Sequence, residues 1–220
     1  MSHASNPTFL YDIFIRVGGG KTRTIAKNCT TACVLINSND VVGDDLWLWR
    51  ADHDNSGKGL VQWTDNPADH GLVVNGVRVS MYGLAVEHFE DHQTVWNGEN
   101  GNTYFYQSEF PYQADDTSWA QANRSSYYLN TNVKTHNAKG LGIYLFLQKS
   151  PINVNSAIES PAISSSINFA GIATFVGNND TSFITHGINN FGDKAQNMCK
   201  DEKIGLSYKC PSIYLYDVPQ

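Results

Sequence analysis

Two glutamates, Glu87 and Glu109, occupy equivalent positions in neighbouring apolar runs of this sequence, each twelve residues after an asparagine. Two carboxyls held close together resist being ionised at the same time, so the pKa of one of them rises. The protonated carboxyl can then donate a proton while its partner acts as a base or a nucleophile. Retaining glycosidases hold such carboxyls about 5–5.5 Å apart. The pair predicts hydrolysis of a glycosidic bond; the alternative is a solvated face without a catalytic role.

A second candidate group consists of Asp52, His53 and His88. An aspartate beside a histidine can orient a proton donor, and both residue types can contribute to a metal site. No tight ligand spacing accompanies these residues, so we predict no metal and no other cofactor. The alternative role is structural, as hydrogen-bonded residues that brace a loop.

Side chains that could hold a sugar accompany both groups. An aromatic ring offers a flat apolar surface to a sugar ring, and polar side chains can bond to its hydroxyls. The predicted substrate-binding residues are Trp49, Arg50, Trp63, Gln107, Tyr112 and Trp119. Trp63 and Trp119 could equally belong to the core, because aromatic side chains in β proteins are often buried.

A recurring phrase predicts how these residues are positioned. A short apolar run, an asparagine and a small residue recur at 34–38, 72–76 and 94–98, with looser copies at 127–131 and 165–169. The shortest step between the asparagines, 22 residues, is about one coil of a three-sided parallel β-helix, and longer steps add a loop. A hairpin at the Asn-Gly pairs is the alternative, but the next strand begins too far along the chain. The sequence therefore predicts an all-β fold, a right-handed parallel β-helix of the pectin-lyase-like kind.

Aligning the coils on their asparagines predicts which side chains share a face, because side chains alternate along a strand. The predicted inward positions are Leu46, Leu84, Tyr106, Leu48, Val86, Ser108 and also Tyr104. Trp49, Glu87 and Glu109 then stack on the outward face of three coils. Insertions at about 50–70 and 111–123 become long loops on one side of this face. The turn asparagines are expected to bond to one another as a ladder.

Residues 1–220 are predicted to form a single β-helix domain, either complete or a fragment of a longer β-helix. Residues 196–220 form a closing segment that contains two cysteines. The first strand, at about 9–17, has no capping helix before it, and open strand edges recruit other chains. Either earlier coils are missing or a partner covers this end, and a homo-oligomer through open ends is the partner this predicts.

The bulk composition limits the other partners. The net charge is −6 and no basic run occurs, so nucleic acid and anionic membrane surfaces are not expected partners. No stretch is long and apolar enough to span a bilayer.

The cysteines and sequons indicate a secreted protein. Four cysteines allow three pairings. We favour the two local pairs, Cys29–Cys33 and Cys199–Cys210. The predicted glycosylation sites are the three Asn-x-Ser/Thr asparagines, Asn28, Asn123 and Asn179.

Several segments together resemble a known group of proteins. These segments are 45–53 (DLWLWRADH), 71–76 (GLVVNG), 82–88 (YGLAVEH), 96–98 (WNG), 104–109 (YFYQSE) and 185–190 (THGINN). They are similar to the C-terminal half of secreted microbial β-helix proteins labelled coagulation factor 5/8 type domain proteins. That group belongs to the pectin-lyase-like superfamily, near glycoside hydrolase family 55. The resemblance implies a parallel β-helix and an action on glucan.

Two functions of different classes follow. The first is a secreted carbohydrate-active protein that binds a neutral, β-glucan-like polysaccharide and hydrolyses it through the carboxylate pair. The second is a non-catalytic structural protein whose β-helix ends assemble into end-to-end or filamentous oligomers.

Overall fold

The computed structural model describes residues 3–19, 30–54, 61–114, 119, 122–147, 152–177, 182–191, 195–196 and 212–217. The secondary-structure elements whose bounds lie within these residues are all strands, and they form two sheets of seven strands each. Within the sheets, neighbouring strands are parallel except for two antiparallel pairs. This agrees with the predicted all-β, parallel architecture. No helix in the described part of the chain is long and apolar enough to cross a membrane.

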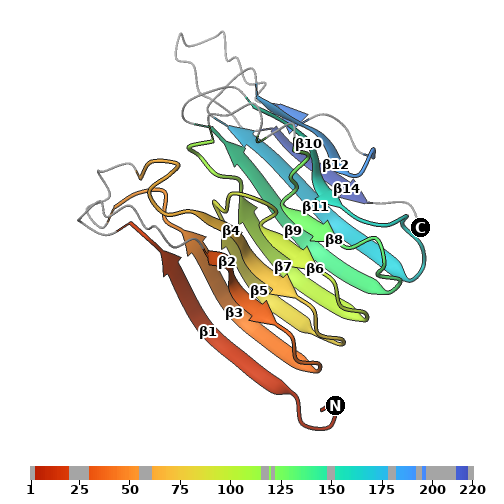
Figure 1. Cartoon of the computed structure of the whole chain (residues 1–220). Coiled ribbons are helices and arrows are strands. Elements are labelled where there is room, and N and C mark those ends of the chain that lie inside the picture. Colours follow the sequence, from red (N-terminus) through yellow and green to blue (C-terminus); the bar gives the residue numbers. More distant parts are fainter. Residues whose placement is uncertain are drawn as a thin grey trace, which may run out of the picture.

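The first sheet contains the long strands, which run side by side along the molecule (Figure 1). Its order is β1 (Thr8–Val17), β3 (Val41–Arg50), β5 (Ser80–Glu87), β7 (Gly101–Glu109), β9 (His136–Phe146), β11 (Ile167–Gly177) and the antiparallel β14 (Ser212–Asp217).

The second sheet contains the shorter strands that alternate with these along the chain. Its order is β2 (Thr30–Ile36), β4 (Ala68–Val74), β6 (Thr94–Trp96), β8 (Tyr127–Leu129), β10 (Asn153–Glu159), β12 (Phe183–Ile188) and the antiparallel β13 (Ala195–Gln196).

Each of the six parallel strands of the first sheet is bent at the same level by a residue with positive φ. The six bend residues are Asp12, Asp45, Gly83, Phe105, Gly140 and Gly171, with φ between 52° and 72°. The pairing registers skip these positions, so the bends stack from coil to coil. The left-handed residue turns the strand, and one long strand thereby supplies two sides of each coil.

The core confirms the predicted register. Leu46, Leu84 and Tyr106 are each 1% exposed, and the next inward row of Leu48, Val86 and Ser108 is fully buried. The prediction that Tyr104 faces inward is wrong, because its side chain is partly exposed. Left-handed Phe105 lies between the two tyrosines and resets the alternation, so Tyr104 stacks instead on Tyr82, with 5.2 Å between ring centroids.

Asparagines on neighbouring turns bond to one another. Each of Asn75, Asn97 and Asn130 donates from its Nδ2 to the Oδ1 of the preceding asparagine in the row, which begins at Asn37, over 2.7–3.0 Å. Asn168 was aligned with this row, and the structure corrects that. It lies inside β11, paired with Asn137, to which its side chain also donates.

Cys33, in β2, is a free cysteine, so the predicted pair with Cys29 is not formed in this structure. Burial raises the pKa of the Cys33 thiol to about 11, which keeps it protonated and a poor nucleophile. Cys29, Cys199, Cys210, Asn28 and Asn179 lie outside the described residues. The Cys199–Cys210 pair and glycosylation remain predictions.

The glycines that follow Asn75 and Asn97, Gly76 and Gly98, pack against the turn before them. A Cβ added at Gly98 would lie 1.8 Å from the carbonyl oxygen of Gly76. Since the turns cannot stay so close with a larger residue, we expect Gly98→Ala to lower the free energy of unfolding by about 3 kcal/mol. A denaturant titration measures this.

Gly140→Ala is the matched control. Gly140 has φ of +72°, but an added Cβ would meet nothing closer than 3.8 Å. The expected loss is about 1 kcal/mol, from backbone strain alone. If the two variants lose the same stability, close contact between turns is not what requires Gly98.

Candidate active site

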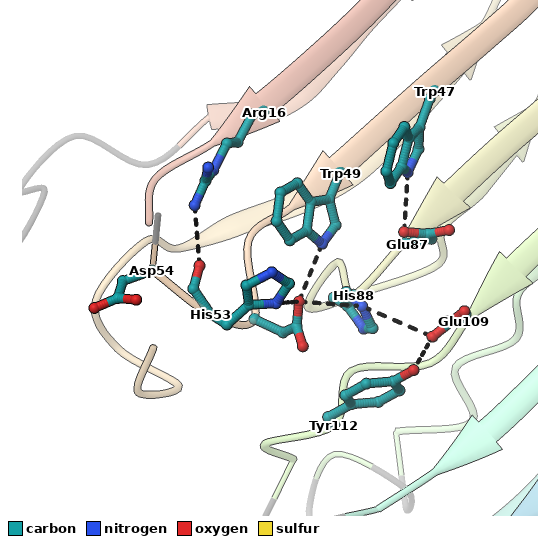
Figure 2. Close-up of a pocket in the computed structure, with 10 residues that line it drawn as sticks. Arg16, Trp47, Trp49, His53, Asp54, Glu87, His88, Glu109 and Tyr112 are labelled. Carbon is teal, nitrogen blue, oxygen red and sulfur yellow. Dashed lines mark hydrogen bonds and ion pairs between the residues drawn. The ribbon is translucent and has the colours of Figure 1, made fainter. Parts of the chain in front are cut away.

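A pocket of about 630 Å³ lies where β1, β3, β5 and β7 end (Figure 2). It is lined by Arg16, Trp47, Trp49, Asp52, His53, Asp54, Glu87, His88, Glu109 and Tyr112. All five residues predicted to be catalytic are among these, because parallel pairing brings the same end of each strand to one edge.

Glu87 and Glu109 are direct neighbours, paired across β5 and β7, and Trp49 pairs with Glu87 on the other side. The predicted stack of these three positions is confirmed. Neighbouring strands lie about 4.8 Å apart. The two carboxyls therefore share one part of the pocket and must influence each other's ionisation.

Burial raises the pKa of Glu87 to about 7. The indole of Trp47 opposes this shift by donating from Nε1 to Oε2 over 2.9 Å, and the negative charge of Glu109 adds to it. A carboxyl with this pKa holds a proton near neutral pH, as a general acid must.

Glu109 is also partly buried, and this raises its pKa, but two donors favour its ionised form. The Tyr112 hydroxyl donates to Oε2, and Gln107 Nε2 donates to Oε1 over 3.1 Å. In return, burial and the neighbouring carboxylate raise the pKa of Tyr112, which remains a protonated donor. Glu109 is thus better suited than Glu87 to carry the negative charge of the pair.

Asp52, His53 and His88 form the floor of the pocket. The ring of His53 donates from Nδ1 to Asp52 over 2.9 Å, and Trp49 donates to the same oxygen over 3.2 Å. His88 Nε2 lies 3.7 Å from Asp52 and 3.9 Å from Glu109, too far for direct hydrogen bonds. Burial lowers the pKa of His88 to about 4, so the ring is neutral at neutral pH.

The aromatic wall comes mainly from β3. The Trp47 and Trp49 rings lie 5.9 Å apart, and Phe14 on β1 lies 4.8 Å from Trp47. Trp49, predicted to bind substrate, is only 7% exposed, whereas Trp47 is 44% exposed. Trp47 therefore offers the larger surface to a ligand, and Trp49 supports it from below.

Four of the six predicted binding residues do not line the pocket: Gln107, which bonds to Glu109, and Arg50, Trp63 and Trp119. Arg50, fully buried, forms an ion pair with Glu90 over 2.8 Å, and its guanidinium lies 4.9 Å from the centre of the Trp63 ring. Trp119 is 2% exposed and donates to the Glu90 carbonyl. Arg50 points away from the outward face because the strand's alternation places it opposite Trp49. Arg50, Trp63 and Trp119 are therefore packing residues that lie outside the pocket lining.

Arg16, Trp47 and Asp54 line the pocket although they were not predicted as site residues. The Arg16 guanidinium lies 4.7 Å from the centre of the Trp49 ring, and the two residues are partners in the β1–β3 register. Extending the coil alignment to the first strand would have found Arg16. For Trp47, the only feature of the sequence that could have indicated a place in the pocket is its position two residues before Trp49, on the same outward side of the strand.

Arg50 connects the loop after β3 to the end of β5. Its guanidinium donates to the carbonyls of Asn66, Trp63 and His88. Through the His88 carbonyl, this cation fixes the backbone next to Glu87. In the described part of the chain, no group of three or more histidine, cysteine, aspartate or glutamate side chains could hold a metal ion.

Fold and pocket together define a parallel β-helix protein with an acidic, aromatic-walled pocket. Residues 1–109 match the family model of the LAM55 pectate lyase-like domain. An exo-β-1,3-glucanase of Streptomyces sp. (strain SirexAA-E / ActE) is 40% identical over 153 residues, which are 68% of this chain and 24% of that protein.

Two solved structures of sacteLam55A from Streptomyces sp. SirexAA-E, one a variant in complex with glucose, superpose with a TM-score of 0.81. They are 32% identical over 98% of this chain, which spans 36% of theirs. These likenesses support a relation of the chain to the pectin-lyase-like superfamily, near glycoside hydrolase family 55. The narrower resemblance to coagulation factor 5/8 type domain proteins remains a prediction.

The buried arginine gives a prediction about stability. Arg50→Met leaves the Glu90 carboxylate without its cation and three carbonyls without their donor. We expect the free energy of unfolding to fall by about 3–5 kcal/mol. The control is Lys139→Met on the exposed face of β9, where the change should stay within about 0.5 kcal/mol. Equal effects in a chemical denaturation would refute the supporting role of Arg50.

Proposed function

We propose that this chain carries the active site of a secreted carbohydrate hydrolase that cleaves β-1,3-glucan. The observation that carries the proposal is the pairing of Glu87 with Glu109 inside one aromatic-walled pocket. The likeness to an exo-β-1,3-glucanase supports the choice of glucan. Polymeric glucan cannot cross a membrane readily, which is why we include secretion in the proposal.

Glu87 is the general acid. It would give its proton to the glycosidic oxygen as the bond breaks, since burial raises its pKa to about 7, close to neutral pH. Glu109 is the ionised partner, held by Tyr112 and Gln107 on the side of the pocket away from Trp47. Its charge would stabilise the cationic sugar in the transition state or activate the incoming nucleophile.

The binding surface is apolar and flat at the Trp47 ring, where a sugar would lie. Trp47 offers an exposed ring directly beside the Glu87 carboxyl, to which its indole is bonded. Arg16 is the only arginine or lysine that lines the pocket among the described residues, and its guanidinium lies over the Trp49 ring. The pocket therefore has little to offer a polyanionic polymer, and its carboxyls would repel one.

Removing either carboxyl tests the proposal. Glu87→Gln and Glu109→Gln keep the side-chain size but remove the acid or the charge, and each should slow the release of reducing sugar from β-1,3-glucan by about 10²–10⁴-fold. The matched control is Asp44→Asn, an exposed residue on β3 that lies outside the pocket. Its rate should be unchanged. Undiminished turnover in a folded Glu87→Gln protein would exclude Glu87 as the acid.

The pH dependence gives a second test of the acid. If Glu87 must be protonated, kcat/KM falls as the pH rises through the pKa of Glu87, about 7. The Trp47 hydrogen bond stabilises the carboxylate and lowers that pKa. Trp47→Phe removes the bond, so the alkaline limb of the kcat/KM profile should move to higher pH. A limb that moves to lower pH would assign it to another group.

A further inference from the structure

A second hollow, of about 400 Å³, lies on the other sheet. It is formed at the ends of β8 and β10 and by the turn that follows β12. The side chains that matter here are Asn123, Tyr128, Asn155, Glu159 and Asn189. None of them lines the pocket that holds Glu87 and Glu109. Its volume is within the range usual for small-ligand sites.

The polar groups of this hollow are bonded into a fixed row. Asn155 donates from Nδ2 to the Asn123 side-chain oxygen over 3.1 Å, and Asn123 donates to Glu159 Oε1 over 2.8 Å. Burial raises the pKa of Glu159 to about 7, and none of the ion pairs among the described residues includes this carboxyl. The row leaves the second Glu159 oxygen and one N–H of each amide for a ligand.

The ring of Tyr128 and the turn that contains Asn189 form the rest of the hollow. Tyr128 pairs with Glu159 in the sheet, and its ring stacks on His92 with 4.7 Å between centroids, which fixes its orientation. Asn189 accepts a hydrogen bond from the Ser160 backbone N–H. It belongs to the 185–190 segment, which the catalytic pocket does not use.

The lining chemistry selects one class of ligand. None of the described residues that line the hollow is a lysine or an arginine, so a phosphate or carboxylate ligand would lack a partner. A single carboxylate is too little charge for a calcium site. Amides and hydroxyls both donate and accept hydrogen bonds, as sugar hydroxyls do, and the tyrosine ring can lie against the apolar side of a sugar.

From this arrangement we infer a second, non-catalytic binding site for a neutral saccharide, formed by Asn123, Tyr128, Asn155, Glu159 and Asn189. It would hold a glucan chain to the protein on a sheet other than the one that carries the catalytic pocket. The inference rests on the proposed function only for the choice of glucan as the first ligand to test.

Calorimetric titration with a β-1,3-linked glucose oligosaccharide tests this site. The protein carries Glu87→Gln to prevent turnover and is produced without N-glycosylation, so that no sugar attached at Asn123 fills the hollow. We expect Asn155→Ala combined with Glu159→Ala to weaken one class of sites at least tenfold. The control is Asn153→Ala, an exposed position on the same strand that does not line the hollow, and its affinity should be unchanged.

Separate measurements test the proposed catalytic site and the proposed second saccharide site, so that either proposal can fail without the other. In protein with Glu87 intact, Asn155→Ala with Glu159→Ala should leave hydrolysis of a short oligosaccharide unchanged, because these residues lie outside the catalytic pocket. Saccharide affinity and stoichiometry equal to those of the Asn153→Ala control would overturn the second site, whatever the hydrolysis assay gives. Calcium binding at the hollow without saccharide binding would also overturn it.

Discussion

Parallel pairing in one unbroken register is the constraint on which this structure depends. Because each strand pairs with the same level of the next coil, every residue meets its counterpart about 4.8 Å away. Whether this contact stabilises the fold depends on the side chains that meet. Amides at the turn gain hydrogen bonds, as from Asn75 to Asn37, whereas carboxyls at the strand end, Glu87 and Glu109, repel each other. One rule thus stabilises the turn and creates a high-energy arrangement of charge at the pocket.

The surroundings divide the two carboxyls into unlike partners. Glu109 receives bonds from Tyr112 and Gln107, while Glu87 has one strong donor, Trp47. Burial disfavours charge on both, and the buried His88 ring remains neutral, so it adds no positive charge to relieve the repulsion. The proton therefore remains on the less supported carboxyl. One additional hydrogen-bond donor at Glu109 thus separates two residues that the repeat made equivalent, and it supports the opposite roles proposed for them.

Much of this arrangement could be predicted because it follows from counting. The asparagine spacing gave the coil register, and the register predicted that Trp49, Glu87 and Glu109 lie side by side. That Asp52, His53 and His88 lie in the same pocket did not follow from this register. Counting failed where backbone conformation changed. Nothing in the sequence signals that Phe105, a bulky residue, adopts φ of 62° and turns Tyr104 outward. The prediction also failed for Arg50, which was assigned to substrate binding. Arg50 is adjacent to Trp49 in the same strand, and its side chain therefore points to the opposite side.

Arg50 shows why a charged residue near an active site need not touch substrate. Beside it, His88 has φ of 68°, which costs a non-glycine residue about 1–2 kcal/mol. Three bonds oppose that strain: the His88 carbonyl accepts from Arg50, its N–H donates to the Glu109 carbonyl, and its ring bonds to the Phe110 carbonyl. These bonds join the end of β5 to the end of β7. The buried cation thereby holds the backbone on which both carboxyls depend, while its own charge is balanced by Glu90, outside the pocket. If this cation lay directly beside Glu87 instead, it would favour ionisation of that carboxyl, and the proposed acid would lose its proton.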